Sequence, residues 1–273
     1  MTTPADPGLP QFETVALARQ GRLLSITLNR PDALNGVNAQ MHQDLVDVVR
    51  FVESDEHSDV LLLSGAGRAF SAGGDFAYMA ENAAHPERFD IDVQRAKRIV
   101  YGILDLEKPL VCKMNGHAVG LGATLALLCD VIFAADHAKI GDPHVAVGLV
   151  AGDGGAFIWP QRIGYTLAKE YLLTGDLIPA KRAAEVGLIN HALPSGELDQ
   201  TVAAFCDRLL KGSTNAIRWT KVTVNLELKR IAHAVMDTGI AYEAITVRSA
   251  DHREAVDALR NKRPPNFKPS GHD

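Results

Sequence analysis

Two glycine-rich loops hold the residues of this sequence that could do chemistry through the main chain. The first spans Gly67–Phe76 and follows an apolar run at Val60–Leu63; the second spans Asn115–Gly122 and follows Leu110–Met114. Glycine at the end of a strand permits positive φ and lets a ligand approach the backbone closely. Where a helix follows, its first N–H groups are unpaired and carry partial positive charge. Two such N–H groups aimed at one point would form an oxyanion hole, which stabilises a carbonyl oxygen that gains charge.

Two other interpretations of these loops remain open. Gly73, Gly74, Gly120 and Gly122 are also typical of tight turns that bind nothing. A phosphate is another candidate ligand, but Gly120-Leu121-Gly122 lacks the third glycine of a GxGxxG motif, and the sequence has no P-loop motif. The residues by themselves therefore leave a turn, a phosphate site and an oxyanion hole as alternatives for either loop.

The periodicity of the apolar residues predicts an α/β core followed by helices alone. Strand-like and helical patterns alternate up to about residue 195, in a strand–strand–helix order that differs from simple βα alternation. The predicted strands are 23–28, 60–63, 110–114 and 131–135, the predicted core helices are 38–53 and 91–106, and the predicted C-terminal helices are 198–210, 216–228, 231–246 and 251–259. We therefore divide the chain into a flexible tail at 1–12, a core at 13–195, and a helical region at 196–273 that would join subunits.

Composition indicates a globular protein with one sizeable core. The chain has 273 residues, of which 47% are hydrophobic and 22% charged, and this excludes wholesale disorder, collagen-like structure and a coiled coil. The net charge of -5 provides no global positive field that would attract nucleic acid or anionic lipid. Cys112, Cys129 and Cys206 lie in separate apolar stretches, so we expect reduced core thiols and no metal site. We expect no signal peptide, no membrane span and a cytoplasmic location.

Several motifs in a fixed order make the chain resemble the crotonase (enoyl-CoA hydratase/isomerase) superfamily. They are RPDALN at 30–35, RAFSAGGDF at 68–76, NGHAVGLG at 115–122, CDVIFA at 129–134, GLVAGDGG at 148–155, AAEVGLIN at 183–190 and NKRPPNFK at 261–268. The resemblance extends from about residue 15 to residue 268. It implies an α/β fold, a crotonase-type spiral of ββα units with a C-terminal helical trimerisation region. It also implies a homotrimer, or a hexamer built from two trimers.

The resemblance further implies an acyl-CoA thioester as substrate, with coenzyme A bound as part of that substrate and no separate cofactor. The donors to the thioester carbonyl oxygen would be the N–H groups of Ala72 and Leu121. Contacts to coenzyme A would come from Arg30, Ala33, Leu34, the Ala69–Phe70 step, Gly73, Gly120 and Lys262. For the two basic residues, solvated surface charge is the alternative. Asp75 would cap the helix that follows it rather than take part in catalysis.

The acid/base residues depart from the pattern of the family's hydratases, which use two glutamates to position and split water. Thr124 stands at the first of these positions and His144 at the second. Histidine is a sound general base because its unperturbed pKa lies near 6.5. Asp153 could orient the imidazole and stabilise its charged form. The alternative is that Asp153 caps the helix predicted near 156–162 and that His144 packs passively.

The combination of DPH at 142–144 with GLVAGDG at 148–154 resembles 6-oxocamphor hydrolase, from the β-diketone hydrolase branch of the superfamily. In that branch a His–Asp pair activates water to break a carbon–carbon bond in a substrate without coenzyme A. His42 and Glu243 also fit the branch, although a surface histidine and a helical glutamate are commonplace. The intact RAFSAGGDF segment and the Gly120 loop favour a thioester instead.

The leading hypothesis is an acyl-CoA enzyme in which His144, assisted by Asp153, moves a proton or activates water. Hydration, double-bond isomerisation and hydrolysis are each compatible with this pair. One alternative is CoA-independent hydrolysis of a cyclic β-diketone. The other is a non-catalytic relative that binds acyl-CoA, because both of the usual glutamates are replaced.

Overall fold

A six-stranded sheet forms the base of the architecture in the computed structural model, which describes residues 8–268. Its strands, in spatial order, are β1 (Val15–Gln20), β2 (Leu23–Leu28), β3 (Val60–Gly65), β4 (Leu110–Met114), β6 (Val131–Ala135) and β9 (His191–Leu193). β1 and β2 form an antiparallel hairpin, and every later pair in this sheet is parallel. A second sheet joins the short strands β5 (Ala118–Val119), β7 (Lys139–Gly141) and β8 (Ile178–Pro179).

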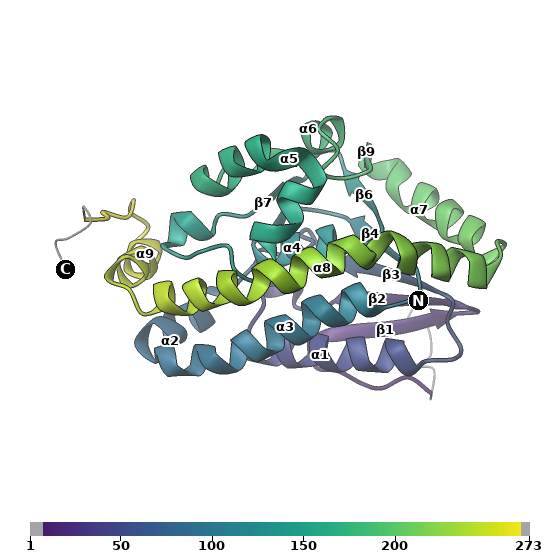
Figure 1. Ribbon diagram of the computed structural model, residues 1–273, viewed down its shortest axis with the longest axis horizontal. Coiled ribbons are helices and arrows are strands. Elements are labelled where there is room, and N and C mark those ends of the chain that lie inside the picture. Colours follow the sequence, from purple (N-terminus) through teal and green to yellow (C-terminus); the bar gives the residue numbers. More distant parts are fainter. Residues whose placement is uncertain (1–7, 269–273) are drawn as a thin grey trace.

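Helices cover both sheets and extend beyond them at the C-terminal end (Figure 1). They are α1 (Ala39–Ser54), α2 (Phe76–Ala84), α3 (Phe89–Asp105), α4 (Leu121–Leu127), α5 (Gly155–Thr174), α6 (Ala180–Glu185), α7 (Ser195–Leu210), α8 (Thr214–Val247) and α9 (Ala250–Arg260). Short 3-10 helices lie at Pro31–Ala33, Pro86–Arg88 and His144–Val147. The predicted α/β class with helices at the C-terminal end is confirmed.

Local sequence explains why the sheet is central and where its crossover helices begin. β3, β4 and β6 are almost wholly apolar and mostly buried, as expected for parallel strands that are covered on both faces. α1 starts at Asn38, whose side chain accepts the N–H of Met41 at 2.9 Å, and its buried side packs on the core. The strand ends of β3 and β4 consequently lead into the two glycine loops at one edge of the sheet.

Two predictions about elements were wrong in instructive ways. The helices predicted at 216–228 and 231–246 are a single helix, α8, which has 34 residues. Lys229 and Arg230 interrupt the apolar pattern, but neither residue breaks a helix, and Arg230 pairs with Glu227 on the exposed face. A hydrophobic pattern can therefore stop where helix propensity continues. The edge strand β1 was missed, because it alternates buried and exposed residues and contributes little to a continuous apolar run.

α8 matters for function because it crosses the molecule from the β9–α7 end to α9 (Figure 1). It packs on α3 and α5, and its residues Ile240 and Glu243 line the same pocket as Gly73 and Gly120 of the glycine loops. Among the helices of residues 8–268, none combines the length and hydrophobicity that a bilayer crossing requires. Most of the tail predicted at 1–12 and the last five residues lie outside the described residues.

Candidate active site

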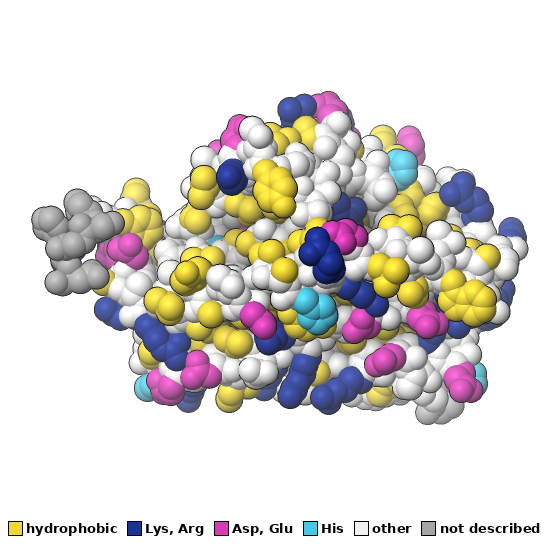
Figure 2. Space-filling model, in the orientation of Figure 1, with side chains coloured by type: hydrophobic (Ala, Val, Ile, Leu, Met, Phe, Trp, Pro, Cys, Tyr) yellow, Lys and Arg dark blue, Asp and Glu magenta, His cyan; other side chains and the backbone are white. Residues whose placement is uncertain are grey.

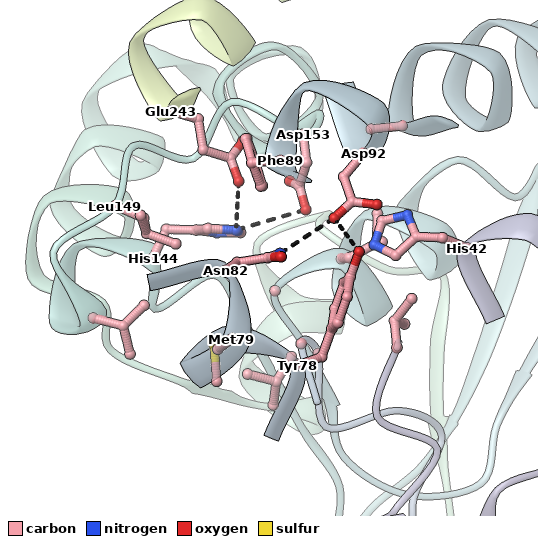
Figure 3. Close-up of a pocket in the computed structure, with 18 of the residues that line it drawn as sticks. His42, Tyr78, Met79, Asn82, Phe89, Asp92, His144, Leu149, Asp153 and Glu243 are labelled. Atoms are coloured by element: carbon pink, nitrogen blue, oxygen red, sulfur yellow. Dashed lines mark hydrogen bonds and ion pairs between the residues drawn. The ribbon is translucent and has the colours of Figure 1, made fainter. Parts of the chain in front are cut away.

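A pocket of about 170 Å³ opens where the two glycine loops, α2, α3, the 3-10 helix at 144–147 and α8 meet (Figure 3). Its walls include Gly74 and Leu121 from the loops, His144 from the 3-10 helix, and Asp153 and Glu243. Segments far apart in the sequence thus supply one cavity. The predicted residues of both loops and of the acid/base group lie around the same space.

The first loop is fixed by polar contacts of its own residues. The carboxylate of Asp75 accepts the N–H of Tyr78 at 3.1 Å and so caps α2, as expected for that residue. The same carboxylate pairs with Arg30 at 2.9 Å. Arg30 therefore helps to hold the loop, whichever contacts it makes to a ligand. Gly73 has a φ of +84°, and a side chain there would meet the Val119 carbonyl oxygen at 2.8 Å.

The structure corrects the predicted donor of the first loop. The N–H of Ala72 donates to the carbonyl oxygen of Leu34 at 3.0 Å, so it is already satisfied within the protein. Gly74, two residues further on, is exposed in the pocket wall, and its N–H has no acceptor within residues 8–268. Gly74 rather than Ala72 is the amide of this loop that a ligand oxygen can use.

The second loop presents its free amide at the start of α4. Gly120 has a φ of +52° and a ψ of -125°, which only glycine adopts without strain. A Cβ atom there would lie 3.6 Å from Cε1 of His144 and 3.8 Å from Cα of Gly73, so the loops and the imidazole are neighbours. Leu121 is the first residue of α4, and its N–H has no acceptor among the described residues.

His144 lies among three buried carboxylates, those of Asp142, Asp153 and Glu243, of which Figure 3 shows the last two. Its Nδ1 is hydrogen bonded to Oδ1 of Asp142. Its Nε2 is 3.6 Å from Oδ2 of Asp153 and 3.9 Å from Oε1 of Glu243. Asp142 therefore orients the ring, whereas Asp153 and Glu243 face the nitrogen that points into the pocket. The last two distances exceed a direct hydrogen bond and are those of long ion pairs.

The environment shifts the pKa values of this cluster strongly. Burial by itself lowers the pKa of His144, but the charges of Asp142, Asp153 and Glu243 outweigh it and raise that pKa well above 6.5. Burial raises the pKa of Asp153 to about 6, against the opposing effect of His144. Burial and the nearby Asp153 raise the pKa of Glu243 well above 4.5. At neutral pH the site thus has an imidazolium donor and a mostly ionised Asp153, and burial disfavours the ionised form of Glu243.

The contacts of Asp153 explain why threonine, and not glutamate, stands at position 124. The Thr124 hydroxyl donates to Oδ1 of Asp153 at 3.4 Å, and the N–H of Gly155 donates to the same carboxylate. Asp153 therefore stabilises the start of α5 and also faces the pocket. Thr124 is fully buried, and its methyl group already lies 2.5 Å from where a Cβ on Gly154 would be. A glutamate at position 124 would need the space that Asp153 occupies.

The same donor atoms have a spacing that suits a metal ion. One ligand atom each from Asp142, His144 and Asp153 lies within 4.8 Å of the others. Without a metal, the charged imidazole has both nitrogens protonated and can act as a proton donor; a metal ion would have to displace the proton on Nε2.

The remaining predicted residues lie in different places. Gly73 and Gly120 line the pocket, as does His42, which comes from α1. Ala33 and Leu34 form the turn before α1, where Leu34 is left-handed with a φ of +52°. A contact from position 70 is wrong, because Phe70 is fully buried and its N–H donates to His117. Lys262 lies in the exposed segment after α9 and outside the pocket walls.

Sequence reasoning missed Asp142 and the polar residues at the far end of the pocket. Asp142 stands two positions before His144, and its side chain is completely buried. An Asp-Pro-His triplet that ends a strand and starts a 3-10 turn brings such side chains together, so the signal was present. Asn82 and Asp92 carried no such signal, because they come from two separate helices.

Comparison with known proteins gives the same assignment as the motifs. The family model described as enoyl-CoA hydratase/isomerase matches residues 18–270. The chain belongs to the enoyl-CoA hydratase/isomerase family. The fold agrees with a crystal structure of an enoyl-CoA hydratase/isomerase from Mycobacterium paratuberculosis, with a TM-score of 0.88 and 38% identity over 92% of this chain and 100% of that one. This likeness confirms the predicted crotonase-type fold.

Two curated relatives of this family have different activities in their names. Crotonyl-CoA hydratase of Syntrophomonas wolfei is 31% identical over 94% of this chain and 98% of its own length. The 1,2-epoxyphenylacetyl-CoA isomerase of Escherichia coli is 33% identical over 90% of this chain and 94% of its own. Membership of the family is therefore compatible with more than one reaction, and the site residues have to decide between them.

Proposed function

We propose that this member of the family binds an acyl-CoA thioester and adds water to it, with the N–H groups of Gly74 and Leu121 holding the carbonyl oxygen. The observation that carries the proposal is the meeting of two free amides and one acid/base cluster in a single pocket. The amides would stabilise the enolate oxygen, and the cluster would supply and remove protons. The relatives' names, crotonyl-CoA hydratase among them, support a thioester substrate.

The cluster assigns opposite roles to its two central groups. Asp153, ionised above about pH 6, accepts a proton from water, whose oxygen bonds to the β-carbon of an enoyl thioester. The imidazolium of His144 protonates the α-carbon as the enolate collapses. Asp153 then returns the proton to His144, whose Nε2 is 3.6 Å away, so the sum is the addition of one water. Glu243, which also faces Nε2, would hold the water in place.

A proline substitution tests the oxyanion hole directly. Leu121→Pro removes the N–H at the first position of α4, where proline fits a helix well. Leu121→Ala is the matched control, because it shortens the side chain and keeps the N–H. We expect turnover of the best thioester from a mixed enoyl-CoA library, followed by mass spectrometry, to fall roughly 100- to 1,000-fold in the proline variant only. Equal rates in the two variants would show that this amide is not a donor.

A second substitution tests the acid/base cluster. His144→Ala should reduce turnover by orders of magnitude while thioester binding, measured by calorimetry, persists. Tight binding without turnover in the native protein would instead support a non-catalytic acyl-CoA-binding role.

One observation favours a second candidate function. His42, His144, Asp153 and Glu243 line one pocket, and these are the positions at which the sequence resembles the β-diketone hydrolase branch. In that case water held between His144 and Asp153 would attack a ring carbonyl and break a carbon–carbon bond. A thermal-shift comparison of an acyl-CoA with a free cyclic β-diketone separates the two functions. Stabilisation by the diketone alone would favour the hydrolase.

We also propose self-association, as a homotrimer or hexamer, through the C-terminal helices. Large apolar side chains are exposed on α8 and α5, among them Trp219 at 60%, Val224 at 72% and Leu173 at 72%. Figure 2 shows hydrophobic side chains over the face that carries these two helices. Large apolar side chains that lie exposed together are typical of surfaces that another subunit covers.

A further inference from the structure

The pocket has a second polar end, apart from the acid/base cluster. It is formed by His42 of α1, Tyr78 and Asn82 of α2, and Asp92 of α3 (Figure 3). Apolar side chains such as Met79, Phe89, Leu149 and Ile240 line the pocket as well. The water-adding chemistry proposed above uses none of the four residues of this polar end.

Asp92 organises this end of the pocket. Its Oδ2 accepts the Tyr78 hydroxyl at 2.6 Å and the Asn82 amide nitrogen at 3.2 Å. Its Oδ1 pairs with Arg95 at 3.3 Å. Because the Asn82 nitrogen is the atom that donates to Asp92, the oxygen of the same amide is left to face another partner.

Two polar atoms at this end are left without partners. Oδ1 of Asn82 is buried on a pocket-lining side chain and meets no donor among residues 8–268. Nδ1 of His42 is likewise buried without a partner within those residues. Burial lowers the pKa of His42, against the opposing charge of Asp92, so the ring is neutral and offers one donor and one acceptor. Unpaired buried polar atoms are costly, which favours a ligand or water that pairs with them.

We propose that this end binds a neutral hydroxyl group on the acyl portion of the substrate, which donates to Oδ1 of Asn82 and accepts from His42. The proposal rests on the thioester function proposed above and adds the substrate class, a hydroxylated acyl-CoA. A hydroxyl satisfies an acceptor and a donor at once. A ketone could pair with His42 alone, and a carboxylate would face the like charge of Asp92. An alkyl end would leave both atoms unpaired.

Matched thioesters test the proposal by binding. The probes are ω-hydroxyacyl-CoA thioesters of increasing chain length, each paired with the ω-methyl thioester of equal size, and titrated by calorimetry. We expect one hydroxyl probe to bind at least about tenfold more tightly than its methyl twin. His42→Phe keeps a ring and removes both nitrogens, and Asn82→Leu keeps the approximate size and removes the oxygen. In either variant the ratio of the two dissociation constants should fall towards one.

The results separate this proposal from the function on which it rests. Tight binding of both twins with a ratio near one at every chain length would overturn the hydroxyl site and leave the thioester site standing. The same holds if both variants keep the preference, or if an ω-carboxyacyl-CoA binds most tightly. Failure of every thioester to bind would overturn both proposals. If one variant does not fold, as judged by its thermal melt, the other still measures the ratio.

Discussion

Replacing Asp153 by asparagine should stabilise the folded chain at neutral pH while it removes activity. The side chain is buried, 6% of the residue being exposed, and burial raises its pKa from an ordinary value of 3.8 to about 6. A rise of about two pKa units corresponds to about 3 kcal/mol between the protonated and ionised folded states. Asparagine has nearly the same shape and no charge, so it mimics the protonated state at every pH.

The pKa of Asp153 determines at which pH the substitution increases the free energy of unfolding. Between about pH 4 and pH 6 the folded chain holds the proton of Asp153 and the unfolded chain releases it. The contribution of Asp153 to the free energy of unfolding therefore decreases as pH rises through that window. Asp153→Asn should show no gain below about pH 4, a growing gain to about pH 6, and a constant gain of about 3 kcal/mol at higher pH. For a chain of this size that is roughly 5 to 10 °C in melting temperature.

Thermal and urea unfolding from pH 4 to pH 8, at one protein concentration, measure the gain. Asp207→Asn is the matched control, because Asp207 is exposed on α7 and has no charged partner within residues 8–268. A gain that is equal at pH 4 and pH 8 would mean that packing, not charge, is responsible. No gain at pH 8 would refute the strained, buried carboxylate and with it the assignment of Asp153 as the proton acceptor.

Three further substitutions probe neighbouring parts of the site. Asp142→Asn removes the carboxylate charge beside Nδ1 of His144, so turnover should fall by roughly two to four orders of magnitude. The pKa of His144 should also fall, so the basic limb of the pH–rate profile should move to lower pH. An unmoved profile would contradict the orienting role of Asp142. Gly155→Ala would place a Cβ against Oδ2 of Asp142 and should cost roughly 1–3 kcal/mol of stability in urea unfolding as well as activity. Gly120→Ala adds strain at a φ of +52° beside the imidazole, so calorimetry should show weaker thioester binding. Gly196→Ala is the control, because a Cβ there meets no atom within 4 Å, and thioester binding should be unchanged.

Much of the fold could be predicted because its elements are apolar and periodic. β2, β4 and β6 have the predicted bounds, since buried parallel strands form short unbroken apolar runs. α8 was divided in two because its exposed polar turn hides the continuity of the helix. β1 was missed because an edge strand buries only alternate residues.

Sequence predicts the site residues that belong to one continuous motif. It does not predict single residues that separate helices bring together. His144 and Asp153 follow from short motifs, and Glu243 from its place in the resemblance, and all three line the pocket. The error at Ala72 has a physical origin, because sequence shows which loop is rich in glycine but not which N–H points inward. The Leu34 carbonyl that takes the Ala72 amide is 38 positions away in the chain. Asn82 and Asp92 meet because the 3-10 turn at Pro86–Arg88 brings the end of α2 close to the start of α3.

The charge cluster itself argues for function rather than support of the fold. A structural ion pair satisfies its oxygen atoms, because buried unpaired acceptors are costly. Here Oδ2 of Asp142 and Oε2 of Glu243 are buried without a partner among residues 8–268, and three carboxylates surround one imidazole. Asp153 and Glu243 both have raised pKa values, so each destabilises the fold when ionised. An arrangement that costs stability in the free protein is retained most readily where a water and a substrate complete its hydrogen bonds.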